Sequence, residues 1–118
     1  MAIITPSNVP FLADQNTFVW AAMANGDVGL PAQFMATGDR TVQVAGTFGV
    51  GGTILFEGSL DGTNYFTLTD AGGTTISRTA AGLKAVLESP LFIRPRVSAG
   101  DGTTSLTAIL TVRRHTNG

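Results

Sequence analysis

Residues 40–68, RTVQVAGTFGVGGTILFEGSLDGTNYFTL, alternate apolar and polar side chains with a period of two. This period is typical of strands that bury one face. Glycine-rich turns at residues 49–52 and 61–64 separate three runs, and glycine supplies the positive φ that tight turns need. The pattern predicts three consecutive antiparallel strands joined by two hairpins. Their predicted buried face consists of Val42, Val44, Phe48, Ile54, Phe56, Leu60, Phe66 and Leu68.

Similar runs at residues 16–23, 28–36, 74–79, 91–98 and 103–114 predict further short strands, and residues 99–102 predict another hairpin turn. Residues 83–88 fit a helix or a strand, and their neighbours favour a strand. Trp20 fits a ligand-stacking platform or the core, and its place in a period-two run favours the core. Short strands separated by glycine turns in a chain of 118 residues predict one all-β domain, a β-sandwich of jelly-roll type. The predicted inward residues of the last two runs are Leu91, Ile93, Pro95, Val97, Leu106, Ala108, Leu110 and Val112.

An extended N-terminal arm is expected over residues 1–15, before the sandwich domain at residues 16–114 and a polar tail at 115–118. Pro6 and Pro10 interrupt any regular hydrogen-bond ladder in the arm. The arm is nevertheless apolar, so it either folds back over its own domain or docks on a neighbouring chain. The arm residues that would make either contact are Ile3, Ile4, Val9, Phe11 and Leu12.

Charge is sparse in this chain, at 13% of residues with a formal net charge of −1. Such a chain has no electrostatic field to attract nucleic acid or an anionic membrane, so neither is an expected partner. No apolar run approaches the roughly 20 residues that span a bilayer, and we expect no secretory signal. There are no cysteines, which excludes disulfides and thiolate metal sites.

Catalytic and metal-binding patterns are not found in the sequence. His115 is the single histidine, and a zinc site or a hydrolase triad needs more partners than it offers. Asp61 and Asp101 precede glycine in turns and lack the spacing of a calcium loop. Neither Glu57 nor Glu88 has a recognisable carboxyl partner for glycosidase chemistry. We therefore expect a protein that is not an enzyme and has no cofactor, metal or catalytic residue.

Glu57, Arg94 and Arg96 fall at mid-strand positions, and Phe92 shares the predicted face of the two arginines. One interpretation is a cross-strand ion pair within the chain. The other is an intermolecular interface, because aromatic and arginine side chains are enriched there. Phe92, Arg94 and Arg96 are therefore candidate interface residues, together with the apolar residues of the arm.

The run GTFGVGGTILFEGSLDGTNYFTL, followed by IRPRVSAGDGTTSLT, resembles small virion proteins of tailed bacteriophages, the head decoration or cement proteins. The resemblance spans residues 25–114, and the sequence has GSLDG where the family more often has GSNDG. It implies a structural protein, made in the host cytoplasm, that binds the major capsid protein at the head surface and stabilises the shell by bridging its subunits. It assigns no catalytic residue.

Two other functions fit the same pattern. Phrases similar to EGSLDGTNY also occur in discoidin-like and other carbohydrate-binding sandwiches, where they mark a hairpin. The first alternative is a glycan-binding module of a virion appendage, which would need a concave face with exposed aromatic residues. A tail-tube or connector protein would share the virion location but differ in symmetry. The low charge and apolar arm also predict self-association, as a homotrimer first and a dimer otherwise, because closed symmetric oligomers cover apolar surface.

Overall fold

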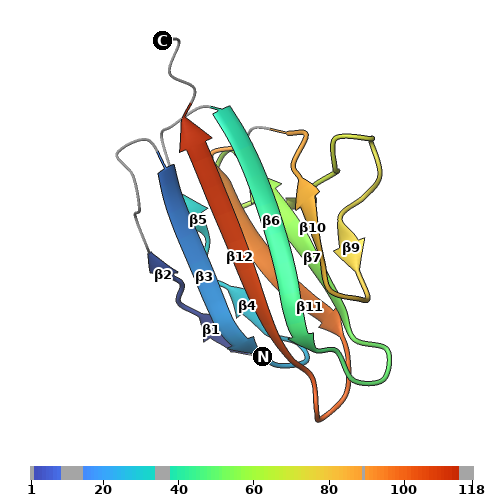
Figure 1. Cartoon of the computed structure of the whole chain (residues 1–118). Coiled ribbons are helices and arrows are strands. Elements are labelled where there is room, and N and C mark those ends of the chain that lie inside the picture. Colours follow the sequence, from blue (N-terminus) through green and yellow to red (C-terminus); the bar gives the residue numbers. More distant parts are fainter. Residues whose placement is uncertain (1, 9–14, 34–37, 89, 115–118) are drawn as a thin grey trace.

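The computed structural model describes residues 2–8, 15–33, 38–88 and 90–114, and within these ranges it contains strands and no helix (Figure 1). The all-β prediction is confirmed. No described helix is therefore long and apolar enough to cross a membrane. The strands are β1 Ile3–Ile4, β2 Ser7–Asn8, β3 Gln15–Met23, β4 Val28–Gly29, β5 Ala32–Gln33, β6 Gly38–Thr47, β7 Thr53–Ser59, β8 Phe66–Thr67, β9 Ser77–Arg78, β10 Gly82–Ala85, β11 Phe92–Ala99 and β12 Ser105–Arg114.

These strands form two sheets. The seven-stranded sheet has the order β1-β4-β11-β7-β8, with β5 paired to β11 and β9 paired to β7. The five-stranded sheet has the order β10-β6-β12-β3-β2. Figure 1 shows β3, β12 and β6 in one layer with β11 and β7 behind them. The pairings are antiparallel except for β1 with β4, which is parallel.

Two predicted hairpins are wrong. β6 belongs to the five-stranded sheet and β7 to the seven-stranded sheet, so residues 48–52 cross between layers. Residues 100–104 do the same between β11 and β12. A period of two identifies a strand with one buried face, but it does not identify the strand's partner. The hairpin at residues 61–64 is confirmed, because β7 and β8 pair with Glu57 opposite Thr67 and Gly58 opposite Phe66.

The core lies between the two sheets. Trp20 is completely buried there, and its Nε1 donates a hydrogen bond of 2.9 Å to the Leu30 carbonyl oxygen, which confirms the core interpretation. The alternating residues of β11 and β12 are buried as predicted, from Ile93 to Val97 and from Leu106 to Val112. The other large core side chains are Met23, Val42, Val44, Ile54, Phe56, Leu68 and Ile76.

Leu60 and Phe66 are exceptions, because both were predicted on the buried face and both are exposed. β7 ends at Ser59, so Leu60 leaves the strand and enters the turn. Phe66 opens a two-residue strand at the sheet edge, and both residues of that strand are exposed. The alternation of apolar and polar residues continues through the turn in the sequence, but strand β7 ends at Ser59, before the turn.

Strand pairing decides three further predictions, for residues 28–36, 74–79 and 83–88. The run at residues 28–36 contains β4 and β5, which flank Pro31 and both pair with β11. Residues 34–36 lie outside the described ranges. The run at residues 74–79 contributes only β9 as a strand. Residues 82–85 form β10 along β6, so the choice between helix and strand at this point is decided for a strand.

Residues 2–8 pair with strands of their own chain at the edges of both sheets. β1 lies beside β4, and β2 lies beside β3. The Ala2 amide donates to Asp27 Oδ1 at 3.0 Å, and Ile4 packs against the core. Val9, Phe11, Leu12 and the tail at 115–118 lie outside the described residues.

Candidate functional site

The outward face of the seven-stranded sheet brings together residues from distant parts of the sequence. Ile3 pairs with Val28, Val28 with Arg96, and Arg96 with Leu55. Directly paired residues project to the same side of a sheet. A row of three apolar residues and one arginine therefore crosses four strands. We call this row, together with Glu57, Tyr65, Phe92 and Arg94, the outer sheet face.

Glu57 forms two ion pairs at the middle of this face. Arg94 lies directly opposite Glu57, and its Nε donates to Glu57 Oε1 at 3.0 Å. Arg96 lies two residues further on the same side, and its Nε donates to Glu57 Oε2 at 3.0 Å. The Glu57 side chain is only 9% exposed. The intrachain interpretation of this trio is confirmed, and both carboxylate oxygens are used.

The Tyr65 ring covers the Arg94 guanidinium. The guanidinium carbon of Arg94 lies 3.8 Å from the centroid of the Tyr65 ring, a cation–π contact. Burial raises the pKa of Tyr65 above its ordinary value. Phe92 lies beneath the turn after β7, where a Cβ on Gly62 would lie 3.3 Å from its ring. The turn after β7 therefore packs on the Phe92 ring.

The chemistry of this face suits docking to another macromolecule. The bonds to Glu57 use the Nε of each arginine, and every guanidinium has two further nitrogens able to donate hydrogen bonds. Arginine and aromatic side chains next to apolar ones are the composition of interface hot spots. Within the described ranges no three potential metal ligands come together.

Four of the eight interface candidates lie on this face: Ile3, Phe92, Arg94 and Arg96. Ile4 does not, because it pairs with inward-facing Gly29 and packs on the core. Val9, Phe11 and Leu12 fall outside the described residues. Val28, Leu55 and Tyr65 were missed as members of the face, because their membership depends on strand register and turn conformation. Two signals were present in the sequence: Leu55 lies two residues before Glu57 on the same face of a period-two run, and Tyr65 adjoins the Asp-Gly turn.

No protein-family model matches the chain, and no curated protein matches it. Among solved structures, the chain is similar to the crystal structure of protein NMB1881 from Neisseria meningitidis. The two share 11% sequence identity with a TM-score of 0.44, over 92% of this chain and 81% of that one.

Proposed function

We propose that this protein is a non-enzymatic head decoration protein of a tailed bacteriophage, which docks on the major capsid protein through the outer sheet face. The observation that carries the proposal is the gathering of Ile3, Phe92, Arg94 and Arg96 on one side of one sheet. The resemblance of residues 25–114 to decoration proteins provides the class of partner. The protein acts at the head surface after synthesis in the host cytoplasm.

The proposed fold is a jelly-roll β-sandwich. Two strand orders support it, β4-β11-β7-β8 in one sheet and β3-β12-β6-β10 in the other. Strands that follow one another along the chain mostly alternate between the layers, as in a jelly roll. This fold presents two broad outward sheet faces, and a broad face suits a protein that bridges the subunits of a shell.

Stabilisation of the shell is additive in this proposal. A standard interface buries roughly 800 Å² per partner, which one face of a small domain can supply. Apolar Ile3, Val28 and Leu55 contribute burial, while the arginines supply directed hydrogen bonds to capsid carbonyl or carboxylate oxygens. Each copy contributes modestly, and many copies on one head contribute together.

The test is co-sedimentation of the purified protein with capsid shells that lack it. Ile3→Ser removes an apolar side chain that is 63% exposed on the outer sheet face. Leu83→Ser is a matched control, because Leu83 is 61% exposed on β10 of the other sheet. We expect Ile3→Ser to weaken binding by about 5- to 30-fold, the effect of removing an interface anchor, and Leu83→Ser to change it less than about twofold.

Absence of wild-type protein from the shell pellet would contradict the proposed function. Equal losses in the two variants would contradict the assignment to this face. Glycan binding is the alternative function, and exposed Phe66 is the observation that favours it, because sugars stack on accessible aromatic rings. Saturable binding to an oligosaccharide array without shell binding would support that alternative.

A further inference from the structure

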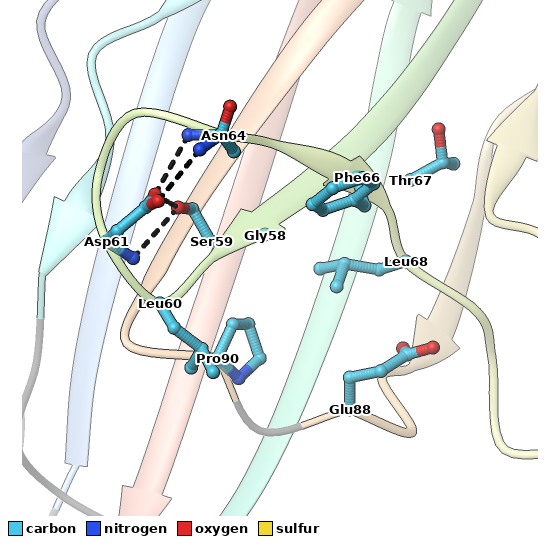
Figure 2. A pocket seen from close by; sticks show the side chains of 10 residues that line it. All are labelled: Gly58, Ser59, Leu60, Asp61, Asn64, Phe66, Thr67, Leu68, Glu88 and Pro90. Carbon is cyan, nitrogen blue, oxygen red and sulfur yellow. Dashed lines mark hydrogen bonds between the residues drawn. The ribbon is translucent and has the colours of Figure 1, made fainter.

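A groove of about 570 Å³ lies where β7 ends. Figure 2 shows Leu60, Phe66, Leu68, Glu88 and Pro90 arranged around it. Its volume falls within the range of roughly 300–1,000 Å³ that is usual for binding pockets. We call it the end groove.

The floor of the end groove is closely packed. A Cβ on Gly58 would lie 2.6 Å from Pro90 Cγ and 2.7 Å from Leu68 Cδ2. Only glycine at this position lets the proline and leucine side chains pack directly on β7. The floor is thus a fixed apolar surface.

The walls of the end groove expose apolar side chains that the fold does not use. Leu60 is 75% exposed and Phe66 is 72% exposed, and both line the groove. Exposed apolar residues that gather around a concavity are typical of a binding site.

The turn beside the groove is held in place by Asp61. Its Oδ1 accepts hydrogen bonds of 2.8 Å from the Thr63 and Asn64 amides, and its Oδ2 accepts one of 2.9 Å from Asn64 Nδ2. Figure 2 shows the two bonds between Asp61 and Asn64. These bonds hold the pKa of Asp61 well below its ordinary value. The carboxylate at this wall is therefore ionised at neutral pH.

Glu88 supplies a second negative charge. Burial alone would raise the pKa of Glu88, but hydrogen bonds from Thr69 Oγ1 and the Thr69 amide outweigh it and lower that pKa. None of the residues that line the groove is basic. The groove thus has an apolar floor and two carboxylates, and no lysine, arginine or histidine is among the residues that line it.

We propose that the end groove binds a short segment of a partner protein that presents an apolar side chain next to a lysine or arginine. The apolar side chain would pack on Leu68 and Pro90 between Leu60 and Phe66. The neighbouring cation would be attracted by the negative charges of Asp61 and Glu88, which lie on opposite sides of the groove (Figure 2). This site is separate from the outer sheet face and does not depend on the proposed function.

The test uses ¹⁵N-labelled full-length protein and two synthetic peptides, acetyl-Ser-Thr-Leu-Arg-Thr-Ser-amide and the same peptide with Glu in place of Arg. We expect the Arg peptide to shift the amide resonances of Gly58, Asn64 and Leu68 in a saturable way. The Glu peptide is expected to bind at least about tenfold more weakly, and added salt to weaken the Arg peptide, because the attraction is electrostatic. Equal binding of both peptides, or of neither, would overturn the proposal.

The double variant Leu60→Ser with Phe66→Ser removes both exposed walls without touching the core. Val50→Ser is the control, because Val50 is 82% exposed in the connection between β6 and β7. We expect the double variant to raise the Kd of the Arg peptide about tenfold and the control to leave it unchanged. Thermal melts establish that both variants are folded. Wild-type affinity in the double variant would overturn the proposal, as would maltotriose shifting these amides when the Arg peptide does not.

Discussion

At the scale of single residues, several of the few charged side chains organise backbone turns. Asp27 accepts hydrogen bonds from the Ala2 and Ala24 amides, and Asp101 accepts one of 2.8 Å from the Val50 amide. Asp61 does the same within its own turn. Each of these carboxylates precedes or follows a glycine, so the Asp-Gly and Gly-Asp dipeptides mark local anchors of the backbone.

Glu57→Gln tests the ion-pair trio. The substitution leaves Arg94 and Arg96 side by side without the carboxylate between them. We expect the free energy of unfolding in urea to fall by about 2 kcal/mol, between the values for exposed and fully buried ion pairs. Lys84→Gln is the control, since Lys84 is half-exposed and lies 3.9 Å from Asp70, and it should change stability by less than about 0.5 kcal/mol. Equal losses of unfolding free energy in the two variants would contradict the prediction that the Glu57 ion pairs stabilise the fold.

Asp101 predicts a pH dependence of stability. Hydrogen bonds from the Thr103 side chain and from the Val50 and Thr103 amides lower the pKa of Asp101 from 3.8 to about 2. Because the folded pKa lies below the unfolded one, the contribution is present above about pH 4 and is lost as the pH falls toward 2. Asp101→Asn should therefore be less stable than wild type at pH 5, with a smaller difference at pH 2. Urea midpoints at both pH values measure this, and a constant difference would contradict it.

At the scale of elements, the two connections that cross between the layers hold each other. Besides the Val50 amide bond to Asp101, the Thr104 hydroxyl donates to the Phe48 carbonyl oxygen at 2.8 Å. These bonds join the β6–β7 connection to the β11–β12 connection. The sequence predicted two independent hairpin turns, at residues 49–52 and 99–102. In the structure, hydrogen bonds link these two connections at one end of the molecule.

Gly49 and Gly51 provide a matched test of this link. Both have a φ of 71°, a left-handed conformation that costs alanine about 1–2 kcal/mol. A Cβ on Gly51 would meet nothing within 4 Å, but one on Gly49 would lie 2.2 Å from Asp101 Oδ1. We expect Gly51→Ala to lose about 1 kcal/mol of stability and Gly49→Ala at least about 1 kcal/mol more, measured by urea unfolding. Equal losses would show that Asp101 can move aside freely.

At the scale of the whole molecule, the distribution of apolar surface predicts self-association. Large apolar side chains are exposed on several elements, including Ile3, Leu60, Phe66, Leu83 and Leu87. Charged residues are only 13% of the chain, so little charge repulsion opposes contact between copies.

We therefore expect a homotrimer, or otherwise a dimer, in multi-angle light scattering at micromolar concentration. The mass should be unchanged by Val50→Ser, which alters a residue in the connection between the layers. A monomeric mass over the whole micromolar range would contradict the prediction.

The sequence by itself determined the long strands β3, β6, β7, β11 and β12 and the inward faces of β6, β7, β11 and β12. It placed Trp20 and the alternating residues of β11 and β12 in the core. It also indicated that Glu57, Arg94 and Arg96 form either an ion pair within the chain or part of an interface, and the structure contains the ion pairs. These features are local, because backbone geometry alone sets a side-chain period of two. The Asp-Gly turn at residues 61–62 was predictable for the same reason.

Only the tertiary structure decided which strands pair, because pairing depends on burial summed over the whole chain. β6 and β7 each bury an inward face against the opposite sheet, so residues 48–52 became a crossing rather than a hairpin. The register then aligned Ile3, Val28 and Arg96 on the outer sheet face. The end of β7 at Ser59 left Leu60 and Phe66 around the end groove. These positions cannot be predicted from a local sequence pattern, because each depends on the packing of residues that are far apart in the sequence.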